Sequence, residues 1–233
     1  MAGSTTTMVA GVDGCPGGWV AFKVNLTSRI TDVELVDLPR MLRSQPDGLT
    51  VIAIDIPIGL LDGPRACDRA ARMLLGPVRG CSVFPSPCRA ALKAPGYRLA
   101  CEINQQLSGR KLSRQAWCIG PKIKAVDDAI TPASHDWAFE VHPEVSFCAM
   151  NYCRPMPHGK KSREGKAERL ELLHTVFPGV SEHLLRRPPH VGVDDLLDAA
   201  AAAWSALRIH EGIAQSVSPP ELDERGLEVA IRY

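Results

Sequence analysis

Apolar and polar positions alternate along the first part of the chain as they do in β-strands. Residues 8–13 place successive side chains on opposite faces and lead into a glycine-rich stretch, which predicts a strand that ends in a tight turn. Residues 19–24 and 30–38 are apolar enough to form two further antiparallel strands. Residues 49–57 are a nearly continuous β-branched run, which is typical of a strand in the middle of a parallel sheet.

Helical patterns dominate the rest of the chain. The strongest covers residues 193–210, where apolar side chains recur on one face and Gly212 follows the last turn. Weaker patterns predict helices at residues 39–45, 66–75, 97–107 and 160–174. Residues 137–142 are the fifth strand candidate, and residues 227–233 are predicted to form an edge strand.

This order of elements predicts an α/β fold with a mixed five-stranded sheet flanked by helices. The first three strands are expected to be antiparallel and the later ones parallel. Residues 78–95 are rich in proline, cysteine and glycine and are predicted to form a loop. No long linker or internal repeat divides the sequence, so we expect one domain over residues 1–233 with an insertion at about residues 78–124.

Composition and charge narrow the classes of protein. With 27 Lys and Arg against 26 Asp and Glu, the formal net charge is +1, so any contact with nucleic acid must be local. The sequence holds no apolar run of about 18 residues, and residues 1–7 lack the features of a signal peptide. We therefore expect a cytoplasmic protein without membrane contact. The eight cysteines show no metal-binding spacing and are expected to be mostly reduced thiols.

Two aspartates stand at the carboxyl ends of predicted strands. Asp13 and Asp55 each precede a glycine or proline turn, where open α/β sheets place their ligand sites. If the two strands are parallel neighbours, these side chains lie about 5 Å apart. Carboxylates so close repel one another, and the arrangement is best explained by a bound cation. Mg²⁺ or Mn²⁺ fits, because hard divalent cations prefer carboxylate oxygens.

The last predicted helix carries further acids. Asp195 and Asp198 are three residues apart and project from one face, and Asp194 shares a face with Asp198. A helix that packs through its apolar residues can deliver such carboxylates to the end of a sheet. The alternative is that aspartates in a first turn cap the helix and complement its dipole, which applies more to Asp194 than to Asp198.

The fifth strand candidate ends in a third group of polar residues. Glu140 is either a further ligand or the partner of a basic side chain. His142 and Glu144 follow on the same side by period-two counting. We expect His142 to support substrate binding indirectly, next to the metal ligands and not as one of them, although a lone histidine is more often structural.

These residues together support metal-assisted hydrolysis of phosphodiesters, in which two divalent ions roughly 3.5–4 Å apart act on one phosphoryl group. The candidate catalytic acids are Asp13, Asp55, Asp195, Asp198 and Glu140, the metal ligands being the four aspartates. Basic residues at 65–72, 110–124 and 160–163 are candidate tracks for phosphates, or alternatively solvated surface. The substrate-binding candidates among them are Arg65, Arg69, Lys122, Lys160 and Lys161.

A series of short blocks along nearly the whole chain resembles one known family. The blocks are residues 11–19, 54–59, 65–68, 71–72, 84–87, 140–144, 160–161 and 195–199. In this order they resemble the family labelled domain of unknown function 429, whose members are regarded as predicted nucleases of the ribonuclease-H-like superfamily. The resemblance implies a ribonuclease-H-like fold, a nucleic-acid substrate and metal-binding acids at Asp13, Asp55 and one of Asp195 or Asp198.

Two other functions remain open at this point. The glycine-rich hairpin around Asp13 also resembles the first phosphate loop of actin-like and sugar-kinase ATPases, which implies an Mg-nucleotide-binding phosphotransferase. The chain is alternatively a catalytically inactive binding protein on the same fold, although adjacent strand-end acids argue against this. The choice between DNA and RNA is open, and a homo-oligomer is compatible with the sequence.

Overall fold

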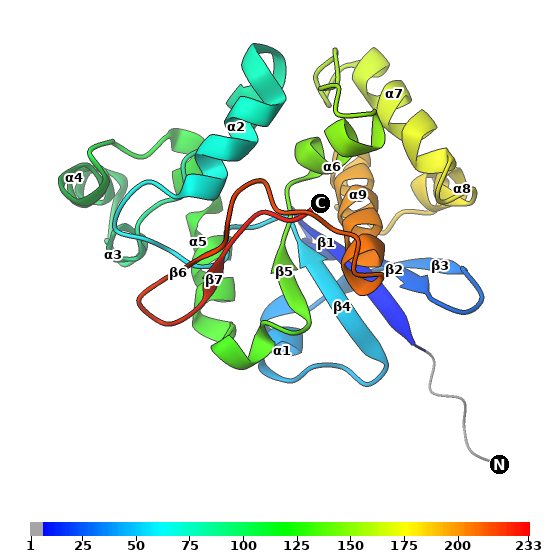
Figure 1. The fold of residues 1–233 in the computed structure, drawn as a ribbon, viewed down its shortest axis with the longest axis horizontal. Helices are drawn as coiled ribbons and strands as arrows, with labels where there is room; N and C mark the ends of the chain where they lie inside the picture. Colours follow the sequence, from blue (N-terminus) through cyan, green and yellow to red (C-terminus); the bar gives the residue numbers. More distant parts are fainter. Residues whose placement is uncertain (1–6) are drawn as a thin grey trace.

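The computed structural model describes residues 7–233, so residues 1–6 of the polar N-terminal stretch lie outside it. Its centre is a mixed five-stranded sheet in the order β3-β2-β1-β4-β5, as Figure 1 shows. The strands are β1 (Met8–Cys15), β2 (Gly18–Asn25), β3 (Thr31–Val36), β4 (Leu49–Ile54) and β5 (Ala138–Glu140). β1, β2 and β3 pair antiparallel, whereas β4 runs parallel to both β1 and β5. The prediction of an α/β protein with a mixed five-stranded sheet is confirmed.

Helix α9 (Val193–His210) covers one face of the sheet and crosses directly over β1 (Figure 1). The approach is close because Gly11 has no side chain: a Cβ at this position would overlap backbone atoms of Ala199 and Ala203. The other helices on this face are α6 (Pro143–Met150), α7 (Arg163–His174) and α8 (Val180–Leu185). The contact at Gly11 therefore fixes the position of the first turns of α9 relative to the end of β1.

The opposite face is covered by α1 (Leu38–Arg43) and α5 (Arg114–Ala129). Ala10 and Val12 of β1 belong to this second core, together with side chains of both helices. Because side chains alternate along a strand, Asp13 lies on the other face with Gly11. Asp13 thus points toward α9.

The segment between β4 and β5 contains more helix than the sequence pattern predicts. α2 (Ala66–Arg79) extends beyond residue 75 although Gly76, at φ +59°, interrupts its regular backbone. The predicted loop at 78–95 contains the one-turn helix α3 (Arg89–Leu92), and α4 (Tyr97–Ser108) matches its prediction. α5 is not predicted at all; Ser113 begins it by accepting a hydrogen bond from Ala116 N.

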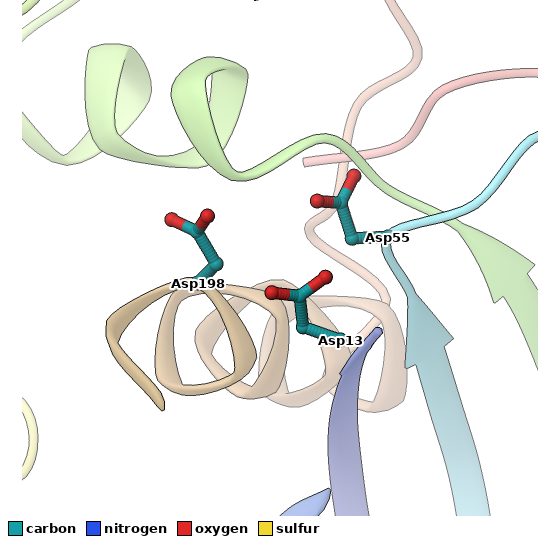
Figure 2. Close-up of side chains that lie close together, drawn as sticks. All are labelled: Asp13, Asp55 and Asp198. Carbon is teal, nitrogen blue, oxygen red and sulfur yellow. The ribbon is translucent and has the colours of Figure 1, made fainter. Parts of the chain in front are cut away.

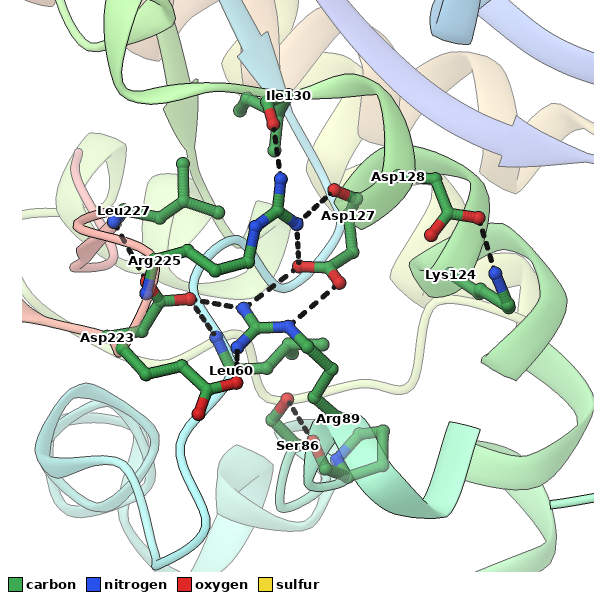
Figure 3. A network of polar contacts seen from close by, with 12 residues as sticks. Leu60, Ser86, Arg89, Lys124, Asp127, Asp128, Ile130, Asp223, Arg225 and Leu227 are labelled. Atoms are coloured by element: carbon green, nitrogen blue, oxygen red, sulfur yellow. Dashed lines mark hydrogen bonds and ion pairs between the residues drawn. The ribbon is translucent and has the colours of Figure 1, made fainter. Parts of the chain in front are cut away.

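The C-terminal part of the chain contacts both the insertion and the edge of the sheet. The predicted edge strand at 227–233 is reduced to β7 (Glu228–Val229), which pairs with β6 (Glu221–Leu222), and to an isolated parallel bridge between Arg232 and Val141, the residue after β5. Figure 3 shows what holds this segment: the buried guanidinium of Arg89 donates to Asp127 of α5 and to Asp223 near β6. Within residues 7–233, no helix has the combined length and apolar character needed to cross a bilayer.

Candidate metal centre

Three aspartates from distant parts of the chain meet at one end of the sheet. Asp13 comes from the end of β1, Asp55 directly follows β4, and Asp198 lies on α9. One carboxylate oxygen of each lies within 4.8 Å of the others, and Figure 2 shows the three groups facing a common space. The parallel register pairs Val12 with Ile54, which places the next residue of each strand side by side.

The surroundings of these carboxylates are strongly desolvating. Asp13 is 8% exposed and Asp198 only 1%. Burial, followed by the nearby charges of Asp55 and Asp198, raises the pKa of Asp13 well above its ordinary value. Burial likewise raises the pKa of Asp55 and of Asp198 to about 6 each, although Lys160 opposes the shift.

Only part of the negative charge is balanced by protein groups. Asp13 Oδ1 accepts a hydrogen bond from Gly14 N at 2.6 Å, and Lys160 Nζ donates to Asp198 Oδ2. Asp198 Oδ1 is buried, yet no group in residues 7–233 donates to it. Three converging carboxylates, one ammonium group and an unpartnered buried oxygen fit a divalent cation that prefers oxygen ligands.

Asp195, the other candidate on α9, has a different position. Its Oδ2 accepts a hydrogen bond from Gly192 N at 2.9 Å at the start of the helix. Asp195 lines the cavity around Asp13, Asp55 and Asp198, but within residues 7–233 the group of three converging carboxylates contains Asp198 and not Asp195. The structure thus gives Asp195 the helix-start hydrogen bond that was one of the alternatives, and it brings Asp198 to the end of the sheet.

Glu140 and Arg65 are engaged with each other. Arg65 Nη2 lies 2.5 Å from Glu140 Oε1, and Ile58 N donates to Glu140 Oε2 at 2.7 Å. Arg65 is 2% exposed and also lies 3.3 Å from Asp68 Oδ1. Both oxygens of Glu140 therefore have protein partners, as in the alternative interpretation of this residue, and the Arg65 guanidinium is buried among acids.

The remaining substrate-binding candidates are dispersed. Lys122 Nζ donates to the carbonyls of Cys15 and Gly18 and lies 4.7 Å from the ring centroid of Trp19, so it holds the turn between β1 and β2. Lys160 and Lys161 line a cavity of about 600 Å³ that contains the three aspartates, the site cavity. Arg69 instead lines a neighbouring cavity on α2.

His142 and Glu144 also line the site cavity. Glu144 Oε1 accepts a hydrogen bond from Arg169 at 2.5 Å, whereas Glu144 Oε2 and His142 Nδ1 are buried without a partner among residues 7–233. Glu144 raises the pKa of both Asp55 and Asp198. Period-two counting placed Glu144 on the strand beside Glu140, but β5 ends at Glu140 and Glu144 lies in the first turn of α6. Its role was not predicted because its partner Arg169 lies on a different helix, α7.

Comparison with known proteins gives one assignment. No curated protein and no solved structure matches the chain. The family model described as protein of unknown function (DUF429) matches residues 11–223. The matched region contains Asp13, Asp55 and Asp198, together with the sheet and α9 that position them. The chain therefore belongs to the DUF429 family.

Proposed function

We propose that this protein is a metal-dependent phosphodiester hydrolase, a nuclease of the ribonuclease-H-like type. The observation that carries the proposal is the convergence of Asp13, Asp55 and Asp198 within 4.8 Å at the carboxyl ends of two parallel strands. The unpartnered oxygen of Asp198 supports it, because a buried carboxylate oxygen without a donor is costly unless a cation binds it. Strand order 3-2-1-4-5 with acids on the first strand, the fourth strand and the last helix agrees with such an enzyme.

The three aspartates would hold Mg²⁺ or Mn²⁺. A divalent cation in this position supplies Lewis-acid stabilisation of the charge that develops on the phosphoryl group. The chain contributes the geometry: β1 and β4 fix two carboxylates, and α9 fixes the third through its contact at Gly11. Lys160 keeps a positive charge beside Asp198, and Lys161 lines the cavity that the phosphodiester would enter.

A calorimetric titration with Mn²⁺ tests the site without a choice of substrate. We expect the wild type to bind Mn²⁺ and the Asp13→Asn variant to lose at least about tenfold in affinity, because one charged ligand is removed. Asp47→Asn, an exposed aspartate after α1, is the matched control and should bind as the wild type does.

Cleavage of labelled DNA and RNA strands in Mn²⁺ then tests the activity. We expect hydrolysis by the wild type and by Asp47→Asn but not by Asp13→Asn. The proposed function is wrong if the wild type binds no Mn²⁺ at millimolar concentration, or if Asp13→Asn cleaves as fast as the wild type.

A further inference from the structure

A second cavity of about 610 Å³ adjoins the site cavity and is lined by basic side chains. Arg69 and Arg72 reach it from α2, and Arg110 and Lys111 reach it from the segment after α4. We call this cavity the basic pocket. α2 and α4 lie on the same side of the molecule (Figure 1). Two of the basic stretches noted separately in the sequence therefore meet in space.

The positive charge of the basic pocket has little compensation. In the part of the chain that the structure describes, Arg69, Arg110 and Lys111 form no ion pair, and Arg72 donates only to the Val83 carbonyl. Among the lining residues that the structure describes, the one carboxylate is that of Asp68, which is 6% exposed and already accepts a hydrogen bond from Ser86 N. Four cations facing one concave space favour a ligand with more than one negative charge.

The basic pocket lies next to the site cavity that contains the three aspartates. Asp68 lines both cavities, so the two share a wall. A flexible polyanion with one phosphate at the three aspartates can therefore place a neighbouring part of itself among the four cations. A ligand that fits into one cavity alone would contact either the aspartates or the four cations, but not both.

The remaining lining of the basic pocket mixes apolar and uncharged polar side chains. Met73, which is 81% exposed, stands beside the arginines of α2, and Pro64, Pro85 and Leu112 are further apolar residues of the lining. The polar residues are Ser86, Asn104, Ser108 and Ser113. An exposed methionine adapts its shape to different partners, and the plane of an arginine guanidinium can stack on the face of a nucleobase. Single-strand binding grooves combine a positively charged track for the backbone with planar groups that stack on the bases, and the arginines of the basic pocket can supply both.

We propose that the basic pocket binds single-stranded nucleic acid next to the cleaved bond, so that the enzyme acts on strands and not on duplexes; this rests on the proposed function. The pocket volume is in the range of small-ligand sites, which can enclose a nucleotide but not a double helix. A strand offers phosphates and unstacked bases together, whereas a duplex hides its bases.

Fluorescence anisotropy with oligothymidylate and oligouridylate of about 12 nucleotides, in EDTA so that no strand is cleaved, tests the pocket directly. The test variant is Arg69→Ala with Arg110→Ala, both exposed residues, and the matched control is Arg40→Ala with Arg43→Ala on α1. Loss of two phosphate contacts should weaken strand binding about 20-fold at about 0.1 M salt and reduce the salt slope by about 1.4. The control should bind as the wild type does.

Three outcomes would overturn the proposal. The first is unchanged strand binding by the test variant, and the second is an equal loss in the control. The third is a duplex of the same length that binds the wild type as tightly as the strand does and weakens equally in the test variant. The two oligonucleotides separate DNA from RNA, since a preference for one appears as a difference in wild-type affinity.

The same variants distinguish this proposal from the proposed function. Because Arg69 and Arg110 do not line the site cavity, Mn²⁺ binding by the test variant should equal that of the wild type. If the test variant binds strands as the wild type does while the wild type binds Mn²⁺ and cleaves, the protein is a nuclease that holds its substrate elsewhere. If strand binding depends on the basic pocket but the wild type neither binds Mn²⁺ nor cleaves, the protein is a single-strand binding protein and the proposed enzymatic function is wrong.

Discussion

Lys160 acts as an internal counter-charge for the three aspartates. Its ammonium group pairs with Asp198, and Asp198 and Asp55 raise the pKa of Lys160. Lys160 therefore competes with a divalent cation for Asp198 while it stabilises the metal-free protein.

Replacing this lysine should have opposite effects on the metal-free and metal-bound protein. We expect Lys160→Met to lower the free energy of unfolding in EDTA by about 1–2 kcal/mol, a value discounted because the side chain is 39% exposed. The same change should enlarge the increase in melting temperature that Mn²⁺ produces. Thermal melts with and without Mn²⁺ measure both. Lys161→Met, in the same cavity but exposed, is the control; a smaller Mn²⁺ effect in Lys160→Met would contradict the competition.

The candidate site could be predicted from the sequence only as far as local patterns reach. Asp13 and Asp55 were identifiable because each ends an apolar strand, and strand ends define a site once the strands are neighbours. The sequence could not decide between Asp195 and Asp198, because both project from one face of the helix. Only the position of α9 on β1 determines which of them reaches the end of the sheet. The pairing of Glu140 with Arg65 joins residues far apart in sequence and leaves no local signal.

Helices and strands were likewise predictable only where the local sequence pattern is strong. α9, β1 and β4 were predicted to within a few residues because their apolar patterns are sustained and their ends are marked. α5 was missed because its basic residues and Pro121 obscure the apolar face that packs on α1. The short β7 pairs with β6 across a turn, and such brief pairing depends on tertiary contacts more than on composition.

The contact between α9 and β1 is the element-level feature on which the metal centre depends. Any side chain at Gly11 would meet backbone atoms of α9, which cannot move without separating helix and sheet. We expect Gly11→Ala to lower the free energy of unfolding by about 2–3 kcal/mol or more. Mn²⁺ affinity should fall as well, because Asp198 moves away from Asp13.

Urea unfolding and Mn²⁺ titration of Gly11→Ala measure these effects. Gly63→Ala is the matched control, because, apart from its chain neighbours, no atom of residues 7–233 lies within 4 Å of a Cβ at Gly63. Its stability should stay within about 0.5 kcal/mol of the wild type. A Gly11→Ala protein with wild-type stability and Mn²⁺ affinity would show that α9 is not positioned by this contact.

At the scale of the whole molecule, Arg89 joins the insertion to the C-terminal segment. Its guanidinium pairs with Asp127 and Asp223, and Arg225 donates to the carbonyls of Asp127 and Ile130 (Figure 3). We expect Arg89→Met to lower the free energy of unfolding by about 3 kcal/mol, since two buried carboxylates lose a guanidinium partner while Asp127 keeps its ion pair with Arg225. Urea unfolding measures the loss, and Arg98→Met, with its exposed i,i+4 pair, should change little. Equal stability of the two variants would contradict this role.

The metal centre itself should reduce the stability of the fold when no metal is bound. Burial raises the pKa of Asp13 in the folded protein, so the folded state binds a proton more readily than the unfolded state. The stability linked to this proton is fully present below the ordinary aspartate pKa of about 3.9 and is lost as the pH rises through the higher folded-state pKa. Asp13→Asn, which carries no charge at any pH, escapes this loss.

Asp13→Asn should therefore be more stable than the wild type in EDTA at about pH 7.5, by about 0.5–2 kcal/mol, as is common when a functional charge is removed from a buried site. The difference should shrink toward zero at about pH 4, where the wild-type Asp13 is protonated. Saturating Mn²⁺ should reverse the order at about pH 7.5, because only the wild type gains binding energy. Urea unfolding under these three conditions measures the sign of each difference. A variant less stable than the wild type in EDTA at both pH values would mean that Asp13 is a structural residue, and that its carboxylate is retained for the fold and not for a cation.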